Sequence, residues 1–149
     1  MIRITRFFYI SILCFPLFIV SYFTNSLQTM LLAYSVALVH ELFHLFASLL
    51  LCVRIKSIII MPFGMTLRLA DGIIQSPQKE ITIALSGPFA NLMMLAIGKI
   101  IGIFTGENAS IFLFNYINII MFFINMLPCM PLDGGRVLRA FLIDKIGYV

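Results

Sequence analysis

The sequence predicts an all-α integral membrane protein with four or more transmembrane helices and a short membrane-associated β-hairpin between the second and third helices. Three observations support this fold class. The 149 residues are 62% hydrophobic and only 11% charged, whereas soluble domains carry about 25% charged residues. The apolar residues gather in four long runs, and basic residues flank those runs. Residues 1–149 are therefore expected to form one polytopic membrane domain.

Each of the four apolar runs is close to the ~20 residues that a helix needs to cross a bilayer. They comprise residues 7–24, 28–53, 81–104 and 111–130. A fifth helix is expected to begin after Arg136. Arg3 and Arg6 before the first run suggest a signal peptide, but the run is long for one and no small-residue cleavage site follows, so a retained span is expected.

The hairpin is predicted between the second and third runs. Residues 55–61 are rich in β-branched side chains, Pro62-Phe63-Gly64 is a turn signal, and residues 65–69 alternate between apolar and polar. Two short strands around such a turn are typical of a hairpin. Its open edges cannot face lipid, so the hairpin is expected at the membrane surface or against protein.

The basic residues predict the orientation in the membrane. If the four spans alternate, all of them except Lys99 fall on one side: Arg3, Arg6, Arg54, Lys56, Arg68, Lys79, Arg136, Arg139 and Lys145. The positive-inside rule then places the N-terminus and the hairpin in the cytoplasm. The net charge of +4 is explained by this orientation. No basic patch interleaved with aromatic residues is present, so nucleic acid is not expected as a partner.

The second run contains both histidines of the chain, His40 and His44. At a spacing of four residues, their rings project from one helix face about one turn apart, and two such imidazoles can bind one zinc ion. Glu41 is rotated by about 100° from His40, where its carboxylate can act on a zinc-bound water without being a ligand. This is the H-E-x-x-H arrangement of zinc metalloproteases. A structural polar cluster that joins helices is the alternative.

A catalytic zinc ion usually has three protein ligands, and the chain has no third histidine. Glu107 falls on the opposite side of the predicted topology. Asp71 and Glu80 lie in or near the hairpin and are expected to be solvated, and Asp144 is expected to be an ordinary surface charge. These considerations leave Asp133 as the candidate third ligand, and an ordinary Asp-Gly surface turn is the alternative.

The segment before Asp133 supports a ligand role. Pro128 and Pro131 end the fourth helix, and Gly134 and Gly135 allow close approach of the backbone. Non-helical backbone at membrane depth is tolerated where it is buried in protein or lines a water-filled cavity. Such a segment can bring a carboxylate back toward a metal ion on the cytoplasmic side. Cys129 lies in the same segment and could in principle bind zinc, but a buried, inert thiol is the commoner state of such a residue.

Together these elements resemble the site-2 protease family of intramembrane zinc metalloproteases. His40 to His44 match the zinc motif of the family, and Asn125 to Arg136 match its second motif, of the form N-x-x-P-x-x-P-L-D-G-G. Ser86 to Asn91 resemble its small-Gly-Pro-x-x-Asn element. The turn from Met61 to Gly64 is most similar to the bacterial stage IV sporulation FB branch.

The resemblance implies a role for each matching position. His40, His44 and Asp133 would bind one zinc ion per chain, and Glu41 would be the general base. Substrate would be held by Asn125, Pro128 and Pro131 and by the turn residues Phe63 and Gly64.

The resemblance also implies the surroundings of the enzyme. It would be a multi-pass protein of a bacterial membrane, with the active site open to the cytoplasm, and it would cleave a membrane-associated protein such as a pro-sigma factor in sporulation. A membrane protein would act as its inhibitory partner. Members of the sporulation branch continue further, with more spans and a CBS domain that this sequence does not contain.

The predicted function is therefore a zinc metalloendopeptidase that acts within the membrane. The first alternative is a catalytically silent zinc-binding membrane protein that binds partners. The second alternative is a metal-ion transporter, which would need polar residues along a path across the membrane. The outer halves of the second and fourth runs are apolar, which argues against such a path.

Overall fold

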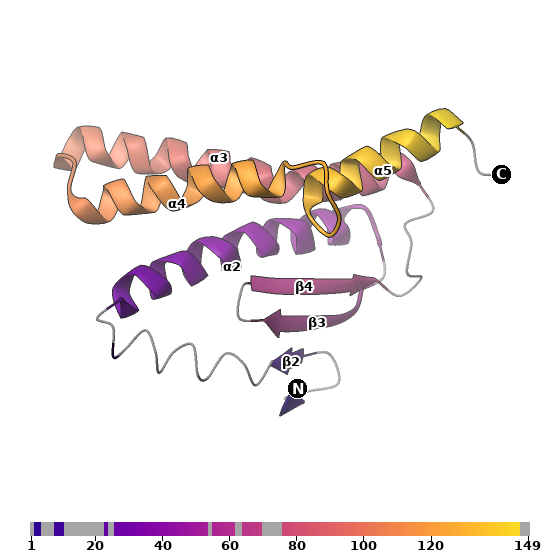
Figure 1. The fold of residues 1–149 in the computed structure, drawn as a ribbon, viewed down its shortest axis with the longest axis horizontal. Helices are drawn as coiled ribbons and strands as arrows, with labels where there is room; N and C mark the ends of the chain where they lie inside the picture. The colour runs from indigo at the N-terminus through magenta and orange to yellow at the C-terminus, as the bar shows by residue number, and fades with distance from the viewer. Residues whose placement is uncertain are drawn as a thin grey trace.

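The computed structural model describes residues 2–3, 8–10, 23, 26–53, 55–61, 64–69 and 76–146. These residues form four longer helices and a four-stranded sheet (Figure 1). In chain order the elements are β1 (Ile2–Arg3), β2 (Phe8–Ile10), α2 (Leu27–Leu50), β3 (Ile55–Met61), β4 (Gly64–Leu69), α3 (Pro77–Thr105), α4 (Ala109–Asn125) and α5 (Asp133–Ile146).

Helix α3 is the centre of the helical part, because it packs against each of α2, α4 and α5. In Figure 1, α4 runs back alongside α3, and α5 lies beside the N-terminal part of α3. Helix α2 lies against this layer, and β4 packs against α2 on its other side. Helices α2 and α5 are thus brought together on the same central helix, although they are far apart in the sequence.

The ends of these helices follow from their sequences. Helix α3 begins with Pro77, whose fixed φ and missing N–H suit the first turn of a helix. Helix α4 is capped by Asn108, whose Oδ1 accepts a hydrogen bond of 2.9 Å from the backbone N–H of Ile111. It ends at Asn125, shortly before Pro128, which could not continue it.

The sheet has the strand order β1-β2-β3-β4 (Figure 1). Strands β1 and β2 pair antiparallel, β2 and β3 pair parallel, and β3 and β4 pair antiparallel. The parallel pairing brings Phe8 opposite Ile58. The register of β3 and β4 shifts between Ile55 and Ser57, as at a β-bulge.

The expected fold class, all-α with four or more transmembrane helices, is wrong. Two helices among the described residues, α2 and α3, are long and apolar enough to cross a membrane, and α4 is a shorter apolar helix of 17 residues. Phe8–Ile10 of the first apolar run form β2. The two strands expected as a hairpin pair antiparallel as β3 and β4, but they belong to a four-stranded sheet. A short apolar run with aromatic and β-branched residues does not distinguish a strand from a helix.

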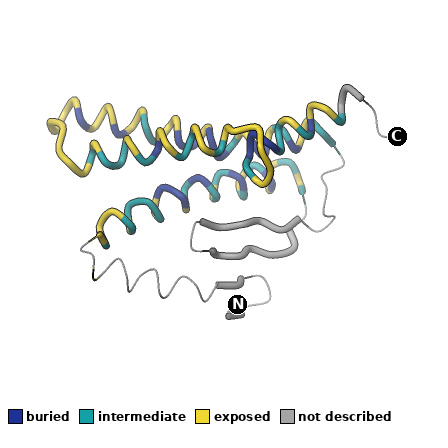
Figure 2. The backbone as a smooth tube through the Cα atoms, viewed as in Figure 1, coloured by how far each residue is buried: buried dark blue, intermediate teal, exposed yellow. Residues whose placement is uncertain are grey.

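The helices bury polar as well as apolar side chains, and their outer surface is rich in large apolar residues. The fully buried side chains of the described residues include Ser48, Glu80, Asn91 and Asn118, while large apolar residues such as Phe104 lie on the surface. Figure 2 shows the buried positions where the helices face one another. So many large apolar side chains on the surface, over a core that contains polar groups, fit a protein whose outer surface contacts lipid.

Candidate metal centre

Three side chains from two helices converge on one point in the helical core. His40 and His44 lie on α2, and Asp133 is the first residue of α5. The Nε2 atoms of the two histidines are 3.1 Å apart, and Oδ2 of Asp133 lies 3.2 Å from Nε2 of His40 and 3.1 Å from that of His44. All three residues are buried. These atoms form a nearly equilateral triangle that could hold a metal ion.

The ring of His44 is held by the backbone of α3. Its Nδ1 lies 2.7 Å from the carbonyl oxygen of Ile83, which can only accept a hydrogen bond, so Nδ1 carries the proton. The hydroxyl of Ser86 lies 3.2 Å from the same nitrogen and donates to the Ile83 carbonyl. In the neutral ring, Nε2 therefore has no proton and turns its lone pair toward the triangle.

The donor set fits a cation better than it fits hydrogen bonds. Nε2 of a neutral His44 and the carboxylate oxygen of Asp133 are both acceptors, so their separation of 3.1 Å places two lone pairs against each other. A cation between them removes this repulsion. In a tetrahedral zinc site with bonds of about 2.0–2.1 Å, neighbouring ligand atoms lie about 3.3 Å apart, close to the three separations here.

The loop between α4 and α5 places Asp133. Its backbone approaches the first turn of α5 so closely that a Cβ at Gly134 would lie 2.3 Å from the carbonyl oxygen of Met126, and one at Gly135 would lie 2.5 Å from that of Cys129. Only glycine fits at these two positions without displacing the backbone. Arg136, one turn along α5, has Nη1 3.6 Å from Oδ1 of Asp133, so its charge lies on the side of the carboxylate away from the histidines.

Helix α3 also touches the histidines through Gly87. A Cβ at this position would lie 2.3 Å from Nε2 of His44 and 2.6 Å from Nε2 of His40. The absence of a side chain at Gly87 therefore provides the space in which the two imidazoles meet. Their rings are nearly perpendicular, with centroids 4.7 Å apart.

Glu41 lies next to the triangle without belonging to it. It follows His40 on α2, so its side chain is turned by about 100° around the helix. The residue is only partly buried, and its carboxylate is close enough to interact electrostatically with His40, Asp133 and Arg136. A carboxylate beside the three candidate ligands can accept a proton from a molecule bound there.

The other predicted site residues lie in three places. Asn125 ends α4, and its side chain donates to the carbonyl oxygen of Met121. Pro128 and Pro131 are exposed in the loop that leads to Asp133. Gly64 is the first residue of β4. Phe63 lies outside the residues that the structure describes.

Two sequence-based interpretations need correction. Glu80 was expected to be solvated, but it is 2% exposed and forms an ion pair with Arg139, because it faces α5 rather than the strands. Cys129 was expected to be a buried thiol, but it is exposed. The contact of Ile83 with His44 was not predicted, because a backbone carbonyl carries no sequence signal.

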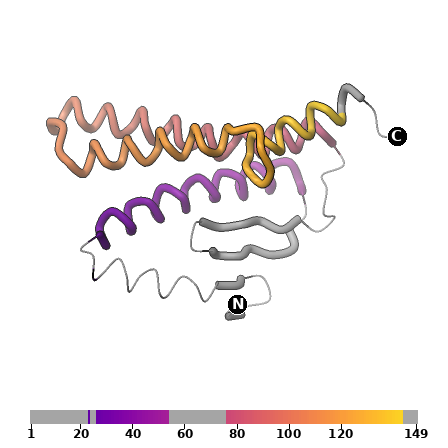
Figure 3. The backbone as a smooth tube through the Cα atoms, viewed as in Figure 1, coloured from indigo at the N-terminus to yellow at the C-terminus, as the bar shows by residue number. Residues whose placement is uncertain are grey.

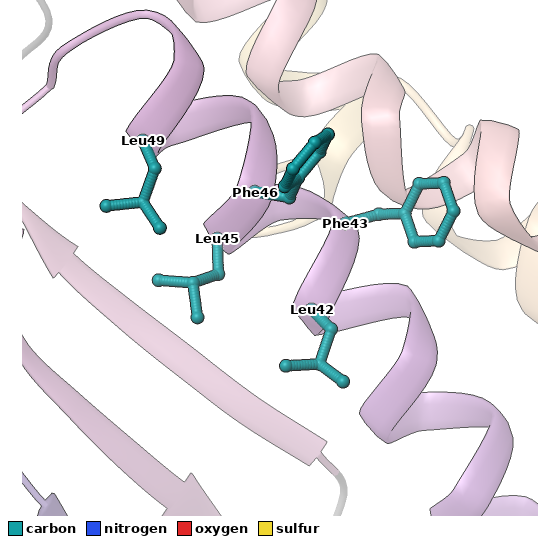
Figure 4. A pocket seen from close by; sticks show the side chains of 5 residues that line it. All are labelled: Leu42, Phe43, Leu45, Phe46 and Leu49. Atoms are coloured by element: carbon teal, nitrogen blue, oxygen red, sulfur yellow. The ribbon is translucent and has the colours of Figure 1, made fainter.

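A hollow of about 380 Å³ on α2 is separate from this centre. Its lining is entirely apolar and consists of Leu42, Phe43, Leu45, Phe46 and Leu49. In Figure 4 the three leucines point to the side where the strands lie. The hollow offers no group for proton transfer or metal binding, whereas the histidine and aspartate triangle offers three candidate ligands.

Comparison with known proteins gives curated relatives and a similar solved structure, while no family model matches the chain. Stage IV sporulation protein FB of Bacillus subtilis is 28% identical over 131 residues, which cover 84% of this chain and 44% of that protein. A zinc metalloprotease of Methanocaldococcus jannaschii is 29% identical over 114 residues, 74% of this chain and 33% of that protein. The chain thus spans less than half the length of these relatives.

The solved structure of a site-2 protease from Methanocaldococcus jannaschii superposes with a TM-score of 0.76 at 25% sequence identity. The match covers 99% of this chain and 73% of the solved one. The similarity therefore includes both helices that carry the triangle and the loop between α4 and α5.

Proposed function

We propose that the chain is a zinc metalloendopeptidase of the site-2 protease family, which hydrolyses a peptide bond of a membrane-associated protein. Its similarity to a curated zinc metalloprotease, to stage IV sporulation protein FB and to a solved site-2 protease supports this proposal. His40, His44 and Asp133 would hold one zinc ion, and Glu41 would be the general base. Among the observations that support the proposal, the acceptor-to-acceptor contact of His44 with Asp133 at 3.1 Å carries it, because a bound cation explains that contact.

Different residues of the site would have different roles in the hydrolysis of the peptide bond. When bound, zinc supplies a Lewis acid that makes water nucleophilic near neutral pH and polarises a carbonyl group. The carboxylate of Glu41 takes a proton from the attacking water as the new C–O bond forms. Glu41 then gives this proton to the nitrogen of the peptide, which leaves as an amine when the C–N bond breaks. The Ile83 carbonyl keeps the lone pair of His44 directed at the centre.

Substrate must reach this centre as an extended segment. Asn125, Pro128 and Pro131 lie at the end of α4 and in the loop that leads to Asp133, and we assign them to substrate contact. Gly64 begins β4, which packs against α2. We assign Gly64 and the neighbouring Phe63 to receiving a substrate strand, a mode in which main-chain hydrogen bonds supply affinity.

A finer proposal concerns the biological substrate. One relative is named as a sporulation protein, and the sequence resembles that branch at the turn from Met61 to Gly64. We therefore propose a membrane-associated pro-sigma factor as substrate and a membrane protein as inhibitor. The enzyme would lie in a bacterial membrane with its N-terminus and the opening of its active site toward the cytoplasm.

The test of the proposed function compares the parent chain with Glu41→Gln. Each is co-expressed with membrane-tethered candidate substrates, cleavage is followed by gel, and zinc is measured in the purified protein. We expect the parent to cut and to contain about one zinc ion per chain, as three protein ligands imply. Glu41→Gln should still bind zinc but no longer cleave substrate. Glu107→Gln makes the same chemical change at an exposed carboxylate and is the matched control, which should cleave like the parent.

Two results would contradict the proposal. Normal cleavage by Glu41→Gln would exclude Glu41 as the base. A parent chain that binds zinc but cuts none of the tethered substrates would favour the silent zinc-binding protein instead.

A further inference from the structure

The first turn of α3 contacts both helices that carry the candidate ligands. Glu80 faces α5 and pairs through Oε1 with Nη2 of Arg139. Its neighbour Lys79 donates from Nζ to the carbonyl oxygen of Leu51 at the end of α2, at 3.0 Å. Two adjacent residues therefore reach in different directions, one to the helix of His40 and His44 and the other to the helix of Asp133.

The pair with Arg139 is the stronger of the two contacts. The side chain of Glu80 is 2% exposed, so its carboxylate is almost fully desolvated, whereas the side chain of Arg139 is 37% exposed. A buried charge that loses its partner destabilises a protein strongly. The bond of Lys79 to Leu51 is exposed and is expected to contribute little.

Glu80 also lies on the stripe of α3 that contacts the metal centre. Glu80, Ile83, Ala84 and Gly87 are all buried, and their spacing of three and four residues places them on one helix face. Ile83 binds the ring of His44 and Gly87 packs against both histidines. One rigid face of α3 therefore holds the α2 histidines at one point and α5 at another.

We infer that Glu80 and Arg139 are positioning residues for the metal centre. Their ion pair fixes α5 along α3, and through α5 it fixes the distance of the Asp133 carboxylate from the two imidazoles. Asp133 is six residues from Arg139, about 9 Å of helical rise, so the pair acts through the helix and not by contact with the metal. This inference rests on the proposed zinc site.

The test measures zinc affinity of the 149-residue chain in detergent micelles, by competition with a chromophoric chelator. The variants are Glu80→Gln, Arg139→Gln and the double variant. Groups that hydrogen-bond a metal ligand directly typically change metal affinity by about 10–100-fold. Because this pair acts through α5, each single variant should bind zinc more weakly by up to about tenfold. Arg139→Gln should have the larger effect, because it leaves the buried Glu80 without a cation.

The double variant distinguishes a positioning pair from two separate contacts. Removing both charges leaves no unpaired buried ion, so its affinity should be no weaker than that of Arg139→Gln. Glu107→Gln and Lys99→Gln serve as controls, because each removes one charge from an exposed residue that belongs neither to the ion pair nor to the candidate metal centre. Both variants should bind zinc like the parent. Lys79→Met should change the affinity less than either variant of the ion pair.

The outcomes separate the inference from the function on which it rests. A parent chain that binds no zinc would overturn the proposed function and this inference with it. If the parent binds zinc and both single variants bind it with the same affinity, the inference is overturned while the proposed function stands. If Glu80→Gln and Arg139→Gln do not fold, Glu80→Asp keeps the charge but shortens its reach. Weaker zinc binding by Glu80→Asp supports the inference, and unchanged binding overturns it.

Discussion

Gly87 lies so close to His44 that a Cβ at position 87 would be 2.3 Å from Nε2 of that ring. The same Cβ would be 2.6 Å from Nε2 of His40, so no rotation of one ring alone makes room. The centre thus depends on a residue of α3 that offers no ligand atom.

Gly87→Ala should therefore abolish or strongly weaken zinc binding, because the added methyl group occupies the space between the two rings. Gly102→Ala is the control, since a Cβ there would meet its nearest neighbour at an ordinary 3.5 Å. The measurement is zinc content after dialysis. Equal zinc in both variants would contradict the geometry of this contact.

A second control separates local from general damage to α3. A Cβ at Gly98 would lie 2.2 Å from Oδ1 of Asn115 on α4, so Gly98→Ala should lower the melting temperature. It should leave zinc affinity near that of the parent, because the strain falls between α3 and α4, away from the histidines. Loss of zinc from Gly98→Ala would show that affinity follows global packing.

Asp133→Asn tests the charge of the third ligand at nearly constant size. A neutral amide oxygen is a weaker zinc ligand than a carboxylate oxygen. We therefore expect zinc affinity to fall by at least tenfold, a factor equivalent to about 1.4 kcal/mol. In the absence of metal, the amide can donate to Nε2 of His44, and the melting temperature should not fall. An unchanged zinc affinity would exclude Asp133 as a ligand.

Removing the metal should destabilise the parent chain. A ligand that binds only the folded state at 100 times its dissociation constant adds about 2.7 kcal/mol. Chelation should therefore lower the thermal midpoint of the parent, and added zinc should restore it. Asp133→Asn should show little of this response, and an equal response in both proteins would place the zinc elsewhere.

Asn91 offers a test of the polar interior. Its side chain is fully buried, and neither amide atom has a hydrogen-bond partner among the residues that the structure describes. Asn91→Leu removes this desolvated group and should stabilise the chain by about 1–2 kcal/mol. A thermal scan at constant zinc checks this, and a lower midpoint would show that the amide makes a stabilising contact.

The sequence predicts the candidate centre better than it predicts the fold. The spacing of four residues puts His40 and His44 on one face of a single helix. The neighbouring prolines and glycines, and the shortage of other suitable acids, single out Asp133. Each of these signals is local, and the structure brings the three residues together although 89 positions separate His44 from Asp133.

The parts that could not be predicted depend on pairings across the chain. Phe8–Ile10 form a strand because β3 is available beside them, and nothing within the first apolar run indicates this partner. Glu80 is buried because Arg139 of α5 faces it, although the two are far apart in the sequence. Ile83 matters through its carbonyl oxygen, which every residue type possesses.

The length of α4 has a consequence for the lipid around the protein. Its 17 residues rise by about 26 Å, less than the ~30 Å thickness of a typical hydrocarbon core. If α4 crosses a bilayer, local thinning of that bilayer is one way to match the short helix. Asn125, where α4 ends, leads directly into the loop of Asp133, so such thinning would bring headgroups and water closer to the side where this carboxylate enters the protein. Hydrophobic mismatch would then favour the residence of this chain in thin membranes.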